Sequence, residues 1–202
     1  MAAAPTRPTP PRIYTIGHST RPFEEFVRIL KSFGVLAVAD VRLIPKSRRY
    51  PHFADTFLAE HLPAQGIAYL PFKSLGGRRR PRKDSVNTAW RNESFRGYAD
   101  FLQTPPFEAA LEELMAAARE RPTATMCAEA VPWRCHRSLI SDALVARGWE
   151  VVDIMDEGKG TVHKLPKFAR VEGVRVTYPP EETGLFAGVE KVEANAPRKR
   201  GR

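Results

Sequence analysis

The sequence predicts an α/β fold, a single domain with a mostly parallel sheet and helices on both faces. Short apolar runs rich in β-branched residues alternate with amphipathic segments of helical period. Strands and helices that alternate at this spacing favour parallel strands joined by helical crossovers. The 202 residues are 43% hydrophobic, which suits one sizeable core and argues for one domain rather than two. The layering expected is therefore Rossmann-like.

The first predicted unit is a strand, a helix and a second strand. Ile13 to Gly17 and Val35 to Val41 are apolar runs typical of buried parallel strands. Between them, apolar residues recur at helical spacing from Phe23 to Leu30, with Pro22 in the first turn and Gly34 at the end. This pattern predicts a helix that connects the two strands.

The alternation continues along the chain. After a polar and aromatic loop from Pro45 to Phe53, a short helix is predicted near Thr56 to Ala64 and a third strand over Ile67 to Phe72. The stretch from Ser74 to Glu93 is irregular, and its length indicates function or mobility. The later predicted elements are a helix over 107–118, a strand over 123–126, a helix that ends at Gly148 and a strand over 150–155.

Two basic segments account for the formal net charge of +9. The loop from Arg78 to Lys83 contributes five cations and the last five residues contribute four. Such runs are most often solvated, but they also admit binding to the phosphates of a nucleic acid. We expect residues 1–12, which are Pro-rich, to be disordered, residues 13–180 to form the α/β domain, and residues 181–202 to be a flexible basic tail.

The apolar runs are too short for a secretory signal or a membrane span. We therefore expect a cytoplasmic protein with no membrane partner. In that compartment the two cysteines are expected to be reduced thiols rather than a disulfide. Nothing in the sequence predicts an oligomeric state.

The stretch from Met126 to Arg137 is the densest in chemically active groups. It holds both cysteines, a carboxylate, an imidazole and two guanidinium groups. Because it follows a predicted strand and precedes a predicted helix, it forms a strand-to-helix turn. In open α/β proteins ligands bind at such turns, since helix N-termini present unpaired N–H groups there. The segment therefore predicts a ligand-binding site.

Polar or glycine residues also follow the other predicted strands where each strand ends. The carboxyl ends of parallel strands meet at one edge of a sheet, so we expect these residues to share one rim and one cleft. The candidates are His18 and Ser19 after the first strand, Asp40 and Arg42 after the second, Gly76 and Gly77 after the third, and Glu129, Cys135, His136 and Arg137 after the fourth.

The same positions resemble those of a known family. The segments concerned are Thr15 to Ser19, Asp40 to Arg42 with Pro45 and Ser47, Leu75 to Gly77, Phe95 to Tyr98, and Cys127 to Glu129 with Pro132 and Cys135 to Arg137. Through them, residues 13 to about 155 are similar to the bacterial domain of unknown function 488 family. The resemblance implies a compact α/β domain marked at these strand ends, and it implies no particular reaction.

Each candidate admits a functional and a structural interpretation. Cys135 lies near a helix start beside Arg134 and Arg137, which favours a thiolate and makes it a candidate nucleophile. The alternative is a small buried apolar residue. Glu129 is a candidate general acid or base, or else the partner of Arg137 or Arg42 in an ion pair.

The roles of the two histidines, of Asp40 and Arg42, and of the two glycines likewise admit two interpretations each. His18 and His136 are candidates for acid/base work or anion binding, or they orient backbone through hydrogen bonds. Asp40 and Arg42, two apart on an extended segment, form either an internal ion pair or an anion clamp. Gly76 and Gly77 form either a backbone nest for phosphate or a simple turn.

No cofactor is required by the sequence. A zinc site made of Cys127, Cys135, His136 and a distant His18 is the weaker alternative, because the spacing contains no close pair of cysteines. We therefore predict no metal.

Two functions are consistent with these patterns. The first is a small enzyme that binds an anionic, phosphate-bearing or nucleotide-like substrate at the carboxyl-terminal rim of the sheet. Its catalytic candidates are Cys135, Glu129, His18 and His136, and its substrate-binding candidates are Asp40, Arg42, Ser19, Gly76, Gly77 and Arg137. The second is a non-catalytic nucleic-acid-binding protein that uses the loop from Arg78 to Lys83 and the basic tail.

Overall fold

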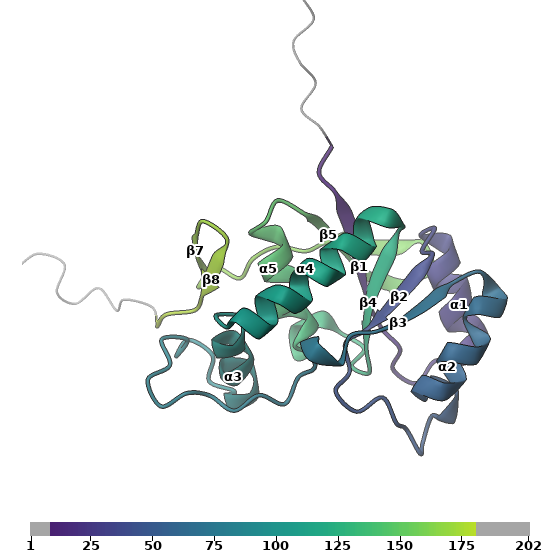
Figure 1. The fold of residues 1–202 in the computed structure, drawn as a ribbon, viewed down its shortest axis with the longest axis horizontal. Helices are drawn as coiled ribbons and strands as arrows, with labels where there is room; N and C mark the ends of the chain where they lie inside the picture. Colours follow the sequence, from purple (N-terminus) through teal and green to yellow (C-terminus); the bar gives the residue numbers. More distant parts are fainter. Residues whose placement is uncertain (1–8, 181–202) are drawn as a thin grey trace, which may run out of the picture.

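The structure, a computed structural model, describes residues 9–180, so the expectations for residues 1–8 and for the tail from 181 lie outside the described residues. Its main sheet has six strands in the order β3-β2-β4-β1-β5-β6 (Figure 1). The strands are β1 (Arg12–Gly17), β2 (Ala37–Asp40), β3 (Ala68–Pro71), β4 (Thr123–Cys127), β5 (Glu150–Asp156) and β6 (Lys159–Val162). The first five are parallel and β6 is antiparallel to β5, which confirms the mostly parallel sheet.

Helices cover both faces of the sheet, which confirms the predicted α/β layering. They are α1 (Phe23–Ser32), α2 (Asp55–His61), α3 (Glu93–Phe101), α4 (Pro105–Glu120) and α5 (Arg137–Val145). On one face, Phe26 of α1 and Leu58 of α2 pack with Val38 of β2. On the other face, buried residues of α3, α4 and α5 pack against the alternate strand positions. None of the helices in residues 9–180 combines the length and apolar character needed to cross a membrane.

The strand order gives β4 a special position in the sheet. It pairs with β2 on one side and with β1 on the other. After β1 and β2 the chain turns toward the face covered by α1 and α2, whereas after β4 it turns toward the opposite face and enters α5 (Figure 1). Connections that diverge in this way open a crevice at the carboxyl ends of the strands, where ligands of α/β proteins bind. Here a crevice is expected on both sides of β4.

The second strand is shorter than the sequence predicts, because Val35 belongs to the end of α1. Gly34 adopts a φ of 66°, and the amide of Val35 donates to the carbonyl oxygen of Leu30. This is the glycine-terminated helix end in which a left-handed residue lets the next amide satisfy a free helix carbonyl. The strand therefore starts at Ala37.

Three short strands after β5 were not predicted. They are β6 and the separate hairpin of β7 (Arg170–Glu172) and β8 (Arg175–Thr177). Every residue of β6 and β7 is exposed, so neither shows the apolar alternation that marks a half-buried strand.

Candidate functional site

Gly17 and His18 form a tight junction between β1 and the loop that follows β4. A Cβ atom placed on Gly17 would lie 1.8 Å from the carbonyl oxygen of Glu129, so only glycine fits here. The amides of His18 and Ser19 donate to the carbonyl oxygens of Cys127 and Ala128, which extends the pairing of β1 with β4 past the strand ends. Ser19 has a φ of 52°, a conformation that is uncommon for a residue with a side chain.

His18 is a buried, neutral imidazole with both ring nitrogens in use. Its ring stacks on Phe53, and it is 3% exposed. Nδ1 lies 2.9 Å from the carbonyl oxygen of Ser19, which can only accept a hydrogen, so Nδ1 carries the proton. Nε2 then accepts from Nη1 of Arg42 at 3.2 Å. Burial, reinforced by the charge of Arg42, lowers the pKa of His18 to about 4.

Asp40 and Arg42 form the internal ion pair that was one of the two interpretations. Nε and Nη2 of Arg42 donate to the two carboxylate oxygens of Asp40 at 2.8 and 2.5 Å. The hydroxyl of Tyr69 donates to the same carboxylate at 2.8 Å. Of the five N–H groups of a guanidinium, the bonds to Asp40 and His18 use three and leave two. Arg42 is therefore a cation held in one orientation.

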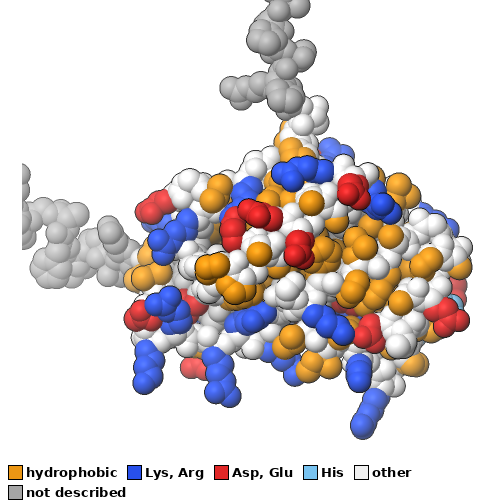
Figure 2. Space-filling view, in the orientation of Figure 1, with side chains coloured by type: hydrophobic (Ala, Val, Ile, Leu, Met, Phe, Trp, Pro, Cys, Tyr) orange, Lys and Arg blue, Asp and Glu red, His pale blue; other side chains and the backbone are white. Residues whose placement is uncertain are grey.

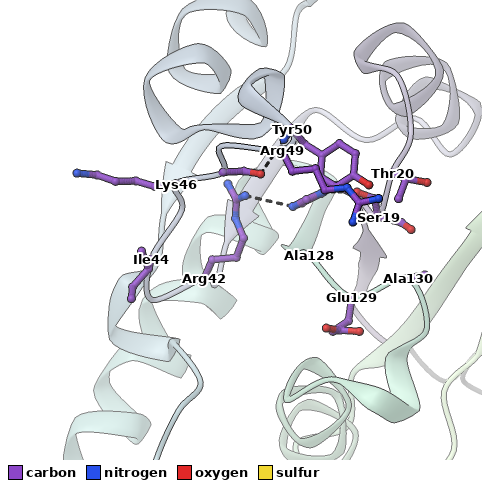
Figure 3. A pocket seen from close by; sticks show the side chains of 12 residues that line it. Ser19, Thr20, Arg42, Ile44, Lys46, Arg49, Tyr50, Ala128, Glu129 and Ala130 are labelled. Atoms are coloured by element: carbon purple, nitrogen blue, oxygen red, sulfur yellow. Dashed lines mark hydrogen bonds between the residues drawn. The ribbon is translucent and has the colours of Figure 1, made fainter.

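Arg42 lies in a cavity of about 420 Å³, called here the basic cavity, at the carboxyl ends of β1, β2 and β4 (Figure 3). Its charged lining residues are Arg42, Lys46, Arg49 and Glu129. Hydroxyl groups come from Ser19, Thr20, Ser47 and Tyr50. The lining thus contains three cations and four hydroxyl groups but one carboxylate, which is a composition suited to an anion.

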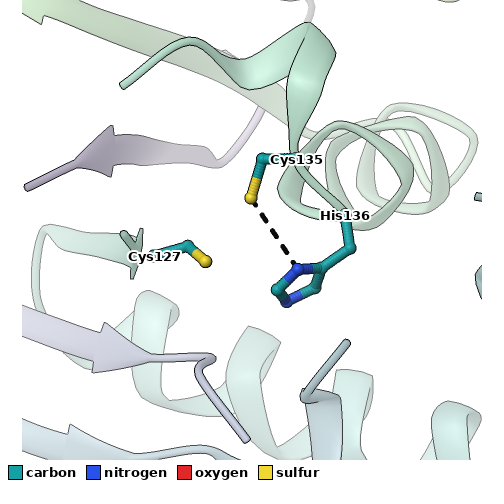
Figure 4. Close-up of side chains that lie close together, drawn as sticks. All are labelled: Cys127, Cys135 and His136. Carbon is teal, nitrogen blue, oxygen red and sulfur yellow. Dashed lines mark hydrogen bonds between the residues drawn. The ribbon is translucent and has the colours of Figure 1, made fainter. Parts of the chain in front are cut away.

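A second cavity, of about 260 Å³, lies at the start of α5 and is called here the thiol cavity. Cys127 at the end of β4 and Cys135 before α5 both line it, and both are free thiols that are 8% and 3% exposed. Figure 4 shows the two sulfur atoms and the ring of His136 converging from these two elements. The hydrogen bond from Cys127 is the main reason that the pKa of Cys135 falls, to about 3, while the sulfur of Cys135 and burial raise the pKa of Cys127.

The segment directly after β2 fixes the orientation of His136. Its Nε2 lies 3.0 Å from the carbonyl oxygen of Val41, so Nε2 carries a proton. Its Nδ1 lies 3.7 Å from Sγ of Cys135. Gly77 packs directly on the ring, since a Cβ there would be 2.9 Å from Nδ1, and Gly76 packs on Leu43 in the same way. Close packing therefore accounts for both glycines of the predicted nest.

Arg137 is buried without a carboxylate partner. It is 1% exposed, and its Nη1 and Nη2 donate to the hydroxyl of Thr15 and the carbonyl oxygen of Glu129, each at 2.7 Å. Its Nε has no hydrogen-bond partner, and no ion pair of Arg137 occurs within residues 9–180. A cation so enclosed orders the loop after β4 and contributes positive potential to the thiol cavity.

Glu129 is the residue common to both cavities. Its side chain is exposed, and its carboxylate has no hydrogen bond or ion pair in the described part of the chain. The ion pair with Arg137 or Arg42, which was the alternative interpretation of Glu129, is not formed, because Arg137 is bonded to the peptide oxygen of Glu129 and Arg42 to Asp40. The carboxylate is therefore free to act on a ligand.

The predicted candidates thus lie at one rim but in two groups. His18, Ser19 and Arg42 line the basic cavity, with Asp40 buried behind Arg42, while Gly77, Cys135 and His136 line the thiol cavity. His18 does not approach the cysteines, so the four-residue zinc set considered from the sequence is not assembled. Lys46 and Arg49 were missed as site residues, although their place in the polar loop after Arg42 was a usable signal.

The Arg78 to Lys83 loop is anchored rather than loosely solvated. Arg79 stacks on Phe101 at 3.8 Å, and the amide of Arg82 donates to Asp100. Gly97 of α3 lets this loop approach, because a Cβ there would lie 2.3 Å from the carbonyl oxygen of Arg79. The side chains of Arg78, Arg80, Arg82 and Lys83 remain exposed.

Other exposed cations lie in the loops that follow β2 and β4, including Arg48 and Arg134. Figure 2 shows Lys and Arg side chains projecting along the lower edge, which is the edge toward which β1 runs in Figure 1. The rim that holds both cavities is therefore also a basic edge of the molecule.

A comparison with protein families is consistent with these motifs. The model of a family described as "Domain of unknown function DUF488" matches residues 22–144, which include Asp40, Arg42 and the segment from Cys127 to Arg137. No curated protein and no solved structure matches the chain.

Proposed function

The chain belongs to the DUF488 family, and from the geometry of its rim we propose that it is a small enzyme that binds an anionic, phosphate-bearing or nucleotide-like substrate in the basic cavity. The observation that supports this most directly is the composition of that cavity. Arg42, Lys46 and Arg49 line it together with four hydroxyl groups, and its one carboxylate belongs to Glu129.

Arg42 is the central anion-binding group in this proposal. Its guanidinium is oriented by Asp40 and His18 before any ligand arrives, so binding costs little side-chain entropy. Because Asp40 balances the charge of Arg42, the net attraction comes from Lys46 and Arg49 at the open side of the cavity. Rigid donors at the base and mobile cations at the mouth are suited to a terminal phosphate or carboxylate.

Glu129 is the proposed general acid or base, since it is the one candidate whose carboxylate is free and lines both cavities. His18 is less suited to that role, because both of its nitrogens are engaged and its ring is neutral. A substrate anchored at Arg42 and passing Glu129 would place its reacting part toward the thiol cavity. The thiol or imidazole of Cys135 and His136 would meet it there.

Isothermal titration with inorganic phosphate and with a nucleoside monophosphate tests anion binding. The double variant Lys46→Gln/Arg49→Gln is expected to weaken binding by about a hundredfold, since each of the two lost charged hydrogen bonds contributes on the order of 1.5 kcal/mol. Arg170→Gln, at an exposed position on β7, is the matched control and is expected to bind normally. Equal affinity in all three proteins would contradict the proposal.

Nucleic-acid binding is a second candidate, favoured by the exposed cations that the anchored loop from Arg78 to Lys83 carries on the same edge. Contacts of this kind reach phosphates without reading sequence. The logarithm of the affinity for a double-stranded oligonucleotide should then fall with the logarithm of salt concentration, by about 0.9 for each phosphate neutralised. Neutralising Arg80, Arg82 and Lys83 together should reduce that slope, and an unchanged slope would exclude the loop.

A further inference from the structure

We propose that Cys127, Cys135 and His136 form a binding site for one soft divalent metal ion of the zinc class, with a fourth position open to the thiol cavity. From the sequence, a zinc site of these residues with His18 was the weaker alternative, because the absence of a close cysteine pair argued against a metal. In the fold, the end of β4 and the turn before α5 bring the two thiols together although eight positions separate them in the chain.

The three donor atoms are spaced as a metal ion requires. Sγ of Cys127, Sγ of Cys135 and Nδ1 of His136 all lie within 4.8 Å of one another. Ligands at tetrahedral angles, with zinc bonds of about 2.3 Å to sulfur and about 2.0–2.1 Å to nitrogen, have sulfur and nitrogen about 3.6 Å apart. The measured separation of Cys135 Sγ from His136 Nδ1 is 3.7 Å. Thiolate and imidazole ligands also favour zinc over harder cations, which prefer oxygen ligands.

The imidazole is already in the orientation that metal binding needs. The carbonyl oxygen of Val41 accepts from Nε2, so Nδ1 is the nitrogen that faces the sulfur of Cys135 and is the one that would bind the ion. Histidine ligands in metal sites commonly donate their other N–H to a carbonyl or carboxylate, which fixes the ring. Gly77 packs closely against the same ring, since a Cβ there would lie 2.9 Å from Nδ1.

The charges around the site favour anionic sulfur. Two thiolates offset a divalent ion, and the cavity is also lined by the cations Arg78 and Arg134. Arg137 is buried beside this turn with an unpartnered Nε and no carboxylate, so anionic sulfur is a favourable neighbour. Glu129 lines the same cavity.

The fourth position is open, because the 260 Å³ cavity beside the cysteines has room for a water molecule or a substrate atom. Three protein ligands with an open position are typical of catalytic rather than structural zinc. A water bound there would lose a proton near neutral pH and become a nucleophile, and Glu129 is placed in the cavity to accept that proton. This catalytic role rests on the proposed function, whereas metal binding itself does not.

The test measures metal binding directly in the full-length chain. The reduced protein, freed of metal by a chelator, is titrated with Co²⁺, and the expected result is one ion per chain with thiolate-to-cobalt charge-transfer absorption. Zn²⁺ should displace the cobalt and protect both thiols from alkylation. Cys127→Ser and Cys135→Ser should each lose the absorption, and His136→Asn should weaken or lose it. His61→Asn, on α2 at the opposite face, is the control and should bind cobalt normally.

The outcomes separate this proposal from the previous one. If phosphate binding fails while cobalt binds at the cysteines, only the anion site is wrong. If wild-type protein with two titratable thiols shows no charge-transfer absorption and no protection by Zn²⁺, the metal site is wrong, whether or not the variants fold. Isolation of a Cys127–Cys135 disulfide that reduction does not convert into a metal-binding form would also overturn it.

Discussion

The buried guanidinium of Arg137 holds the peptide oxygen of Glu129 at 2.7 Å, across the end of β1. That oxygen occupies the space that a side chain at Gly17 would need. One arginine on α5 and one glycine on β1 therefore fix the loop whose carboxylate lines both cavities. The position of Glu129 depends on the packing of these two residues rather than on local turn preference.

Replacing Gly17 by alanine should displace this loop. The new Cβ would lie 1.8 Å from the oxygen of Glu129, which is backbone and cannot move aside without disturbing the bond to Arg137. The expected loss in the free energy of unfolding is about 3 kcal/mol or more, because overpacking here forces a backbone shift. Urea denaturation measures it.

Gly34→Ala serves as the comparison. Gly34 has a positive φ but open space around its Cβ position, so strain alone should cost about 1–2 kcal/mol. Gly17→Ala should also weaken phosphate binding, since the residues 128–130 line the basic cavity. If the two glycine variants lose the same stability, the tight junction between β1 and the loop is not the constraint described.

Much of the fold could be predicted because its signals are local. The apolar runs at 13–17 and 123–126 and the helical spacing around Phe26 are properties of neighbouring residues, and the buried parallel strands keep those patterns clean. The order of the strands could not be predicted, because it depends on which runs pair across long separations. The strand β6 was not predicted, because its exposed residues show no alternation of apolar and polar side chains.

The candidate site shows the same limit. Asp40 and Arg42 are two apart, so strand geometry predicted that they point to the same side and made their ion pair one of the two interpretations. Strand ends predicted the shared rim, but they could not show that it divides into two cavities, because the side on which each loop leaves the sheet depends on the helix that follows. The meeting of Cys127 with Cys135 required the tertiary turn between them.

Asp40→Asn should destabilise the protein strongly. The substitution removes the charge that compensates Arg42, which is 7% exposed, and a buried cation left unpaired costs about 3–5 kcal/mol. The double variant Asp40→Asn/Arg42→Met should recover part of that loss, since both charges are then gone. Chemical denaturation of the single and double variants gives the coupling.

Asp84→Asn is the matched control for that experiment. Asp84 pairs with Arg82 in full solvent exposure, where an ion pair contributes little. A similar effect of the two aspartate substitutions would mean that Asp40→Asn does not leave Arg42 as an uncompensated buried cation.

His18 should stay neutral far below the ordinary range of histidine. Its pKa of about 4 in the folded state lies below the unfolded value of about 6.5, so the neutral ring contributes stability above pH 6.5 that is lost as the pH falls toward 4. A histidine-resolved NMR titration should give a midpoint near 4 for His18. Sulfate binding, which involves no titration of the anion in this range, should show no increase attributable to His18 between pH 7 and 5. A midpoint near 6.5 would contradict the buried pairing with Arg42.

The last prediction concerns a buried network whose residues line neither cavity. His163 lies between Asp142 and Asp153, at 2.8 and 3.1 Å, and the hydroxyl of Tyr178 donates to Asp142 at 2.6 Å. These contacts join α5 and β5 to the segment that follows the small hairpin of β7 and β8. Burial by itself would lower the pKa of His163, but the hydrogen bonds to the two aspartates raise it to about 9.

Because that folded pKa exceeds the unfolded value of about 6.5, the charged ring contributes stability that is fully present below pH 6.5 and is lost as the pH rises through about 9. The contribution is on the order of 3 kcal/mol, since one pKa unit corresponds to about 1.4 kcal/mol. Unfolding free energies measured at pH 6.5 and at pH 9.5 should differ by this amount more in the wild type than in His163→Gln. Equal pH dependence in the two proteins would mean that His163 is not charged in the folded state. A loss of stability in Tyr178→Phe would then show that the hydroxyl of Tyr178, rather than the imidazolium, holds Asp142 in place.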